Sequence, residues 1–267
     1  MKATRVFDGA LLRADLFKGD RRRLFVSFRQ RVGTQGQFEE ARPVRSFTSH
    51  GYAHLHIQSL WNDWFINGET SAMEIALRAL APRYRRVVAM GFSMGGYGAF
   101  RFSGVLGVAQ VIAIAPQVSI HPEVVPFDTR YRDESSGFDQ AAGNLARHAN
   151  RDMAGIVLCD PFVSNDLAHA RLAQGLFQGL RICRLAGGGH PPTRVLRQAG
   201  SLPDLQAQLL HGGPDAAQVI ALHRMGRRCS PSYHAHMARV ARRRDRPALA
   251  DRFRTLKAGA VPVVDKG

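Results

Sequence analysis

The chain has 267 residues, a mass of 29.4 kDa and 45% hydrophobic residues. This length and composition fit one large globular domain, or one domain with an appendage, and exclude a disordered or fibrous protein. The 37 Lys and Arg residues outnumber the 21 Asp and Glu residues, so the formal charge is +16. A charge of this size suggests a nucleic acid, an anionic membrane or an acidic substrate as a partner.

The positive charge is concentrated near the C-terminus. Residues 221–267 hold ten Arg and two Lys against three Asp, a net of +9, which leaves +7 for the first 220 residues. No zinc-ligand pattern, RNA-binding motif or interleaved aromatic residues accompany this charge. We therefore expect a solvated helix face rather than a nucleic-acid partner.

No segment of the sequence is typical of secretion or of a membrane span. The residues after Met1 lack the apolar core of a signal peptide, and no run reaches the roughly 18 apolar residues that a spanning helix needs. Two of the three cysteines, Cys159 and Cys183, lie in apolar runs where small buried side chains are expected. These features predict a reduced, cytoplasmic protein without a transmembrane segment.

The elements begin with a hairpin and continue as alternating strands and helices. Asp8-Gly9 suits a tight turn, and the residues around it predict antiparallel strands over 5–7 and 11–16. Further strands are expected over 24–28, 52–57, 86–90, 108–115, 156–159 and 180–185, and helices over 73–80, 95–102 and 167–177. This alternation predicts an α/β protein with a sheet flanked by helices.

The strands end at Pro191-Pro192, and the chain beyond Gly212-Gly213-Pro214 has a helical pattern. Apolar residues recur at helical spacing over 233–240 and again over 249–256, with a turn expected near 245–247. We therefore predict an α/β domain over residues 1–210, followed by a basic helical appendage over residues 211–267 that includes a helical hairpin.

The most informative motif lies where the strand over 86–90 meets the next helix. Gly91, Ser93 and Gly95 form a G-x-S-x-G pattern. This spacing is typical of a sharp strand-to-helix turn, in which side chains two positions before and after the serine would collide. The turn exposes the Ser93 hydroxyl and directs the positive end of a helix toward a developing oxyanion. With a strand before it and a helix after it, the motif predicts a nucleophile elbow.

A serine nucleophile needs a base, and the base needs an acid that orients it. Asp160 follows the strand over 156–159, and His190 follows a turn of three glycines, Gly187 to Gly189. The order serine, acid, histidine is that of one known arrangement of the triad. Through these residues the chain resembles the α/β-hydrolase superfamily, and its serine esterases in particular, over about residues 5–200.

The resemblance implies an α/β-hydrolase fold with a mostly parallel sheet of about eight strands. It also implies that Ser93 is the nucleophile, that His190 is the general base and then the general acid, and that Asp160 orients His190. Asp166, at the start of the next helix, is the alternative acid, although a charge at a helix N-terminus accounts for it without catalysis.

The resemblance further places the oxyanion hole at the backbone N–H of Met94 and at an amide of the loop after Phe28. Many members carry His-Gly in that loop, whereas this chain has Arg29-Gln30-Arg31. We expect Arg29 to supply the second donor, with Gln30 as the alternative. The departure bears on the shape of the hole and on the substrate.

Other residues have structural explanations beside functional ones. His54 and His56 have the spacing of paired metal ligands, but no Cys, Asp or Glu adjoins them, so we expect strand histidines and no metal. The stretch over 61–65 either walls the substrate or packs as a loop. The segment over 116–150 is too short for a large cap, and its Arg130 and Arg132 either bind an anionic substrate or face solvent.

The sequence thus predicts a serine hydrolase that cleaves a carboxylic ester or thioester through an acyl-enzyme on Ser93. The expected substrate is a small-molecule or saccharide ester, and no cofactor is implied. One alternative is an acyltransferase or deacylase that acts on a saccharide or polymer hydroxyl. Another is a non-catalytic scaffold on the same fold. No motif specifies the acyl group or the oligomeric state.

Overall fold

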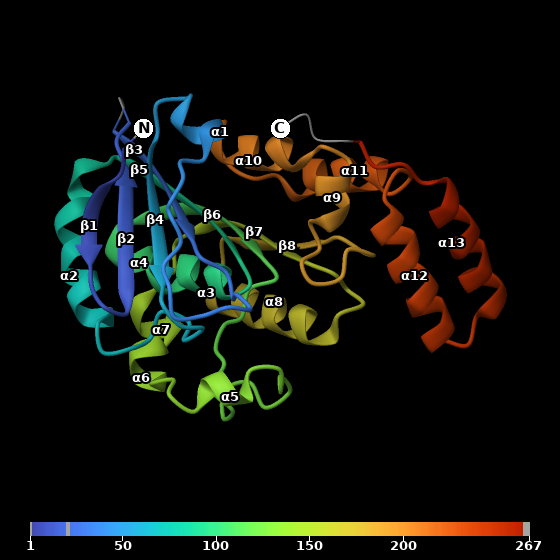
Figure 1. Ribbon diagram of the computed structural model, residues 1–267, viewed down its shortest axis with the longest axis horizontal. Coiled ribbons are helices and arrows are strands. Elements are labelled where there is room, and N and C mark those ends of the chain that lie inside the picture. Colours follow the sequence, from blue (N-terminus) through green and yellow to red (C-terminus); the bar gives the residue numbers. More distant parts are fainter. Residues whose placement is uncertain (1, 20–21, 264–267) are drawn as a thin grey trace.

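One eight-stranded sheet forms the centre of the protein in a computed structural model that describes residues 2–19 and 22–263 (Figure 1). The strands are β1 (Thr4–Asp8), β2 (Leu12–Phe17), β3 (Arg23–Phe28), β4 (Ala53–Ser59), β5 (Arg86–Phe92), β6 (Val108–Ile114), β7 (Ala154–Cys159) and β8 (Leu180–Arg184). Their order in the sheet is β1-β2-β4-β3-β5-β6-β7-β8. β2 pairs antiparallel with β1 and β4, and all the pairings from β4 to β8 are parallel. The predicted fold class, a mostly parallel sheet flanked by helices, is confirmed.

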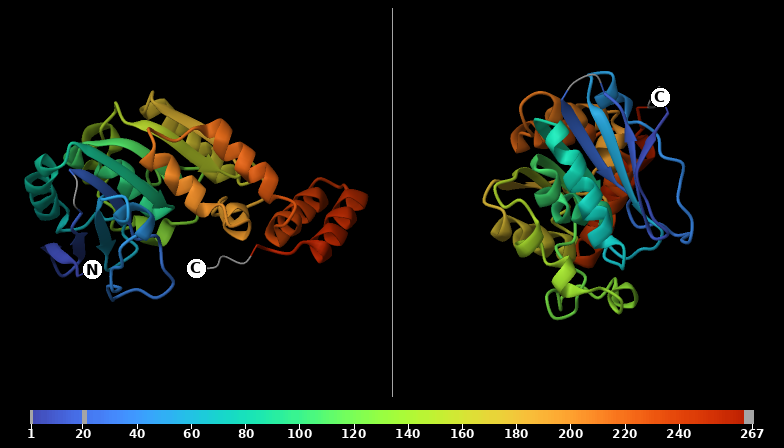
Figure 2. Two further views of the ribbon diagram at one scale, coloured as in Figure 1. Left: turned by 90° about the horizontal axis from the view of Figure 1, so that it is seen from above. Right: turned by 90° about the vertical axis from the view of Figure 1, so that its left-hand side faces the viewer.

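Helices cover both faces of the sheet, which explains why its central strands are apolar throughout. One face carries α2 (Thr70–Leu80), α3 (Met94–Arg101) and α8 (Ser164–Leu176), whose buried residues join one apolar cluster. The other face carries α1 (Arg45–Thr48), α9 (Arg194–Gln198), α10 (Leu202–Leu210) and α11 (Ala216–Gly226), which contribute to a second cluster. Figure 2 shows the sheet between these two layers. Burial raises the pKa of Cys159 and of Cys183 to about 12, in keeping with their predicted place in the core.

The segment between β6 and β7 forms a light cover over one end of the sheet. Its short helices, drawn in green at the bottom of Figure 1, are α5 (Arg132–Ser135), α6 (Gln140–Gly143) and α7 (Leu145–His148). Val118, Ile120, Val125 and Tyr131 from this segment are buried in the first apolar cluster. The segment is therefore packed on the sheet and does not form a separate cap. Two further short helices, η1 (Ala81–Arg83) and α4 (Ser103–Leu106), follow α2 and α3.

The C-terminal helices α12 (Pro231–Arg243) and α13 (Pro247–Gly259) form the predicted hairpin and extend away from the sheet (Figures 1 and 2). The Ser230 hydroxyl accepts a hydrogen bond from the Tyr233 N–H at 3.1 Å, and Pro231 occupies the first helical position, so α12 has a well-defined start. The turn between the helices is where the sequence predicts it. The domain boundary at residue 211 stays a prediction, but α11, which follows it, packs on the sheet through Val219.

None of the helices in residues 2–19 and 22–263 combines the length and the apolar composition that crossing a membrane requires.

Candidate active site

Ser93 has a strained backbone at the carboxyl end of β5. Its φ of 50° and ψ of −119° lie in a region that residues with a side chain rarely adopt. Two glycines permit the turn: a Cβ on Gly91 would lie 2.1 Å from the Gly95 carbonyl oxygen, and one on Gly95 would lie 2.7 Å from the Phe28 carbonyl oxygen. The geometry is the one that the G-x-S-x-G spacing predicts, with α3 beginning directly after the serine.

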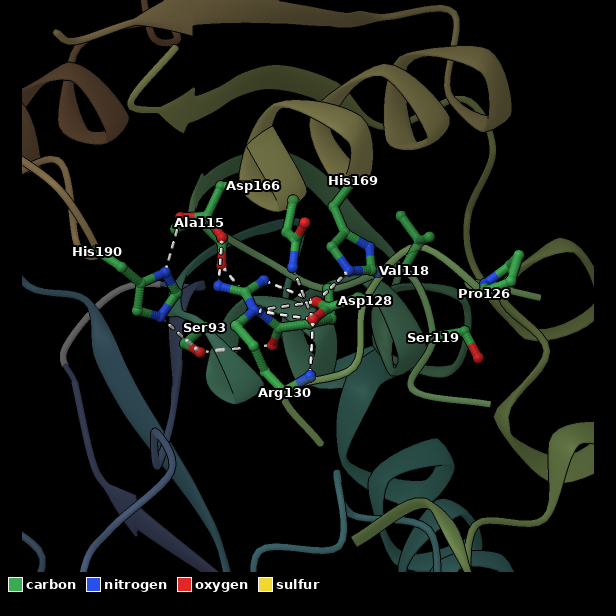
Figure 3. Close-up of polar contacts among 12 residues, drawn as sticks. Ser93, Ala115, Val118, Ser119, Pro126, Asp128, Arg130, Asp166, His169 and His190 are labelled. Atoms are coloured by element: carbon green, nitrogen blue, oxygen red, sulfur yellow. Dashed lines mark hydrogen bonds and ion pairs between the residues drawn. The ribbon is translucent and has the colours of Figure 1, made fainter. Parts of the chain in front are cut away.

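His190 connects Ser93 to a buried carboxylate, which is that of Asp166 (Figure 3). The His190 Nε2 lies 3.1 Å from the Ser93 Oγ, and the His190 Nδ1 lies 2.8 Å from the Asp166 Oδ2. A carboxylate is only an acceptor, so Nδ1 carries the proton and Nε2 is left to accept the serine proton. The three side chains therefore have the contacts of a nucleophile, a base and an orienting acid.

Asp160 does not have the place expected of it. Its Oδ2 accepts hydrogen bonds from the Gly187 and Gly189 N–H groups at 2.9 and 2.7 Å, and its Oδ1 accepts one from Phe162 N–H at 3.0 Å. These amides occupy the carboxylate, which is fully buried, and turn it toward the glycine loop rather than the His190 ring. The prediction that Asp160 orients His190 is corrected: Asp166 contacts the ring, and Asp160 fixes the loop that carries it.

The C-terminal hairpin packs on the same loop. A Cβ on Gly187, whose φ is 91°, would lie 2.3 Å from the Tyr233 ring, so this loop and α12 are in close contact. The His236 Nε2 of α12 lies 3.5 Å from the Asp160 Oδ2. The loop that carries His190 is thus held by Asp160 and by α12, which also lie close to each other.

A chain of ion pairs extends from Asp166 away from His190 (Figure 3). The Arg130 Nη1 donates to Asp166 Oδ1 at 2.8 Å, and the Arg130 Nη2 donates to Asp128 Oδ2 at 2.7 Å. The side chains of Asp166 and Asp128 are 0% and 2% exposed, so Arg130 neutralises two buried carboxylates. It is therefore not available to bind an anionic substrate, which was one of its two expected roles. Neighbouring Arg132 donates to the Pro126 carbonyl at 3.1 Å.

His169 ends this chain as a neutral ring of defined tautomer. Its Nδ1 accepts the Val118 N–H at 3.2 Å, so the proton is on Nε2 and is donated to Asp128 Oδ2 at 3.0 Å. Burial alone would raise the pKa of Asp128, but the hydrogen bonds from His169 and Arg130 hold that pKa well below its usual value. Sequence reasoning missed Asp128 and His169. The one feature of the sequence that could have indicated His169 is its spacing from Asp166, because residues three apart lie on the same face of a helix.

The two amides expected in the oxyanion hole, those of Met94 and Arg29, differ in their hydrogen bonds. Met94 is the first residue of α3, so its N–H has no carbonyl partner within the helix and points out at its N-terminus. The Arg29 N–H, in contrast, donates to the Ile57 carbonyl at 2.9 Å, which makes it unavailable to a substrate. The next amide, that of Gln30, has no acceptor among residues 2–19 and 22–263. Of the two donors expected in this loop, Arg29 has its amide bonded to β4 and Gln30 does not.

Ser93 and His190 open into a cavity of about 300 Å³. Its lining residues come from the loop after β3, from the elbow, from the light cover and from the His190 loop: Gln30, Arg31, Val32, Gly33, Phe92, Ser93, Tyr131, His190 and Pro191. The Tyr131 ring packs at a tilt against that of Trp64, with 4.7 Å between the ring centroids, and Trp64 is fully buried and donates to Gln117. Trp64 thus packs behind the cavity, as a loop residue rather than a wall of the substrate site.

His54 and His56 are hydrogen-bonded to each other through one serine. The Ser27 Oγ lies 2.7 Å from His54 Nε2 and 2.8 Å from His56 Nδ1. Among residues 2–19 and 22–263, no group of three metal-ligating side chains is present. Burial lowers the pKa of His54 to about 3 and that of His56 to about 4, so both rings are neutral at pH 7.

Comparison with known proteins supports the fold. No protein-family model matches the chain, and no curated protein matches it. Among solved structures, the capsule O-acetyltransferase of Neisseria meningitidis serogroup A, in complex with CoA, matches 84% of this chain and 92% of its own, with a TM-score of 0.51 and 12% identity. Est1E from Butyrivibrio proteoclasticus matches 79% of this chain and 100% of its own, with a TM-score of 0.51 and 11% identity.

A third match is the Pyrococcus furiosus esterase Pf2001, over 78% of this chain and 91% of its own, with a TM-score of 0.50 and 14% identity. The chain has the α/β-hydrolase fold. The expected fold class is thereby confirmed. Identities this low make the α/β-hydrolase likeness one of fold, and the chemistry has to be argued from the site.

The buried histidine pair predicts how stability depends on pH. The folded-state pKa values of His54 and His56 lie below the ordinary value of 6.5, so the unfolded chain binds more protons as the pH falls. We expect the two neutral histidines to cost no stability above pH 6.5. Below pH 6.5 the free energy of unfolding should decrease as the pH falls toward 4. Urea unfolding at pH 7.5 and pH 5 measures this slope. The slope should be smaller in His54→Gln/His56→Gln and unchanged in His50→Gln, an exposed control; equal slopes in all three proteins would contradict it.

The ion-pair chain predicts a large cost for removing its cation. Arg130→Met leaves Asp128 and Asp166 buried without their common partner, and we expect it to lower the free energy of unfolding by about 3–5 kcal/mol. Adding Asp128→Asn should recover part of this loss, because one uncompensated charge is then removed. Arg151→Met, at an exposed position, serves as the control. A loss for Arg130→Met no larger than that of the control, measured by urea unfolding, would rule out the network's stabilising role.

Proposed function

We propose that this protein is a serine hydrolase that cleaves a carboxylic ester or thioester through an acyl-enzyme on Ser93. The observation that supports the proposal is the hydrogen-bonded line from the Ser93 Oγ through His190 to Asp166, placed at a strained elbow. Strain of this kind costs of order 1–3 kcal/mol and persists where function requires it. Ser93 is 8% exposed and opens on a cavity, which gives a substrate carbonyl access to its hydroxyl.

In the acylation step, the Ser93 Oγ attacks the carbonyl carbon while His190 Nε2 takes the hydroxyl proton. Asp166 stabilises the imidazolium that forms, and the hydrogen bond from Arg130 keeps Asp166 oriented. The amides of Met94 and Gln30 donate to the carbonyl oxygen as it becomes negative. His190 then passes its proton to the departing alcohol or thiol, which leaves an ester between Ser93 and the acyl group.

Deacylation repeats these roles with a second nucleophile. A water molecule loses its proton to His190 Nε2 as it attacks the acyl carbon, and the same proton then returns to the Ser93 oxygen when the acid is released. The products are a carboxylic acid and free enzyme. Apart from the water molecule, every group in these two steps is a residue of the site.

Acyl transfer is the second candidate, in which a hydroxyl of a saccharide or polymer replaces water. It is favoured by the likeness in fold to a capsule O-acetyltransferase over 84% of the chain. The two reactions share the acyl-enzyme and differ in what attacks it. Competition between water and added hydroxyl acceptors for the acyl group of a 4-nitrophenyl ester distinguishes them. A non-catalytic scaffold is less consistent with the site, since it has no use for a strained serine.

The acyl-enzyme predicts covalent labelling at one residue. A fluorophosphonate reacts with serines that have an assisting base, and we expect stoichiometric labelling of the wild-type protein at Ser93, detected by intact-protein and peptide mass spectrometry. Ser93→Ala should show none. Ser103→Ala, which removes a different buried hydroxyl, should label like the wild type. An unlabelled wild-type protein would contradict the proposed function.

The different contacts of Asp166 and Asp160 predict different losses of activity and stability when each is replaced by Asn. Asp166→Asn presents an amide to the His190 Nδ1 and favours the wrong ring tautomer, so we expect kcat for a 4-nitrophenyl ester to fall by about 10³–10⁴-fold. Asp160→Asn keeps an acceptor toward the glycine loop and should cost less activity but more stability. Initial rates and urea unfolding of both variants check this. The assignment of Asp166 fails if folded Asp160→Asn is the less active of the two.

A further inference from the structure

A second cavity adjoins the catalytic one on the side of His190. It has a volume of about 510 Å³ and shares Gln30, Val32, Phe92 and Pro191 with the cavity that contains Ser93. Its remaining walls come from β3, β4 and α9 and from the loop around Glu39: Phe28, Arg29, Glu39, His56, Thr193, Arg194 and Arg197. The second cavity is therefore adjacent to the one that contains Ser93.

Arg194 and Arg197 are the unpaired cations of this cavity. Both are exposed, stand three residues apart on α9, and have no ion pair among residues 2–19 and 22–263. The other arginines around the site are neutralised: Arg31 pairs with Glu134 at 2.7 Å, and Arg130 pairs with two aspartates. The Arg194 guanidinium lies 3.5 Å from the His190 carbonyl oxygen, which puts positive charge beside the catalytic histidine.

His56 supplies a further donor to the lining of this cavity. Arg29 also lines it, but its terminal nitrogens are bonded to other residues and its unpartnered Nε is shielded from the cavity. The His54 Nδ1 accepts the Val44 N–H, so His54 donates from Nε2 to Ser27, Ser27 donates to His56 Nδ1, and the His56 proton is left on Nε2. The one carboxylate in the lining, Glu39, is already paired with Arg29 at 3.1 Å.

We infer that this cavity is a subsite for an anionic group, such as a carboxylate, sulfonate or phosphate, on the alcohol or thiol part of the substrate. Two arginines and the His56 N–H, opposed by one paired acid, suit a ligand that only accepts hydrogen bonds. We assign the subsite to the leaving group because Arg194, which lines the cavity, lies 3.5 Å from the backbone carbonyl of His190, the residue that protonates the leaving group. The inference rests on the proposed function and names the substrate class of the same site.

The kinetic test compares two acetate esters that differ in charge. 4-Acetoxy-3-nitrobenzenesulfonate carries an anion on its leaving group and 4-nitrophenyl acetate does not; 4-acetoxy-3-nitrobenzoate is the carboxylate counterpart. We expect kcat/KM to be at least tenfold higher for the two anionic esters, after correction for spontaneous hydrolysis. This ratio should fall at least tenfold in Arg194→Gln/Arg197→Gln and decrease with added salt. A wild-type ratio near one overturns the subsite.

A matched control removes the same charge elsewhere. Arg78→Gln/Arg85→Gln deletes two exposed arginines from α2 and from the amino end of β5, the opposite end from Ser93. It should keep the wild-type ratio. If it lowers the ratio as much as Arg194→Gln/Arg197→Gln does, net charge rather than a subsite is responsible and the inference is wrong.

Binding without turnover separates this inference from the proposed function. Calorimetry on Ser93→Ala compares 4-acetamidobenzenesulfonate and 4-acetamidobenzoate with acetanilide, amides that lack a good leaving group. The subsite predicts at least tenfold tighter binding of the two anions, lost on adding Arg194→Gln/Arg197→Gln. Equal binding of all three overturns the subsite even if the esters are cleaved. Failure of Ser93 labelling with selective anion binding would overturn the chemistry and leave the subsite.

Discussion

The buried charge of Asp166 is the constraint on which the arrangement of the site depends. A carboxylate without exposure is costly unless it is paired and hydrogen-bonded in place. Two partners from different parts of the chain meet this need, the His190 ring and the Arg130 guanidinium. Arg130 in turn requires Asp128, which is held by His169. The segment between β6 and β7 is therefore fixed by electrostatics as much as by its apolar contacts.

The sequence was sufficient wherever the determinant is local. A Cβ on Gly91 would collide with the Gly95 carbonyl within the same turn, so this spacing predicts the elbow, and alternating apolar runs predict the strands. The acid was not predictable in this way. Asp160 and Asp166 are six residues apart, and the choice between them depends on the amides of Gly187 and Gly189, which lie distant in sequence and occupy Asp160. Arg29 fails as a donor for a similar reason, since β4 takes its amide.

The net charge of the chain says less about the site than the ion pairs of its individual arginines. The formal charge of +16 draws attention to residues 221–267, where most of the excess lies. Near the catalytic residues, what matters is which arginines lack a partner, and no count of residues reveals that. Arg31 pairs with Glu134 and Arg130 pairs with Asp166, both distant in sequence, whereas Arg194 and Arg197 have no such pair among residues 2–19 and 22–263. Gly212-Gly213 likewise marks the end of a helix without marking the end of the domain, because α11, which follows it, packs on the sheet.

The contact between α12 and the glycine loop gives the nucleophile and the base separate structural origins. Ser93 is positioned by the central strands and α3, which fold around the first apolar cluster. The loop that carries His190 is backed by Tyr233 and His236, which belong to the last helices of the chain. If His190 is the base that we propose, sequence changes in the C-terminal hairpin alter proton transfer and leave the elbow at Ser93 unchanged.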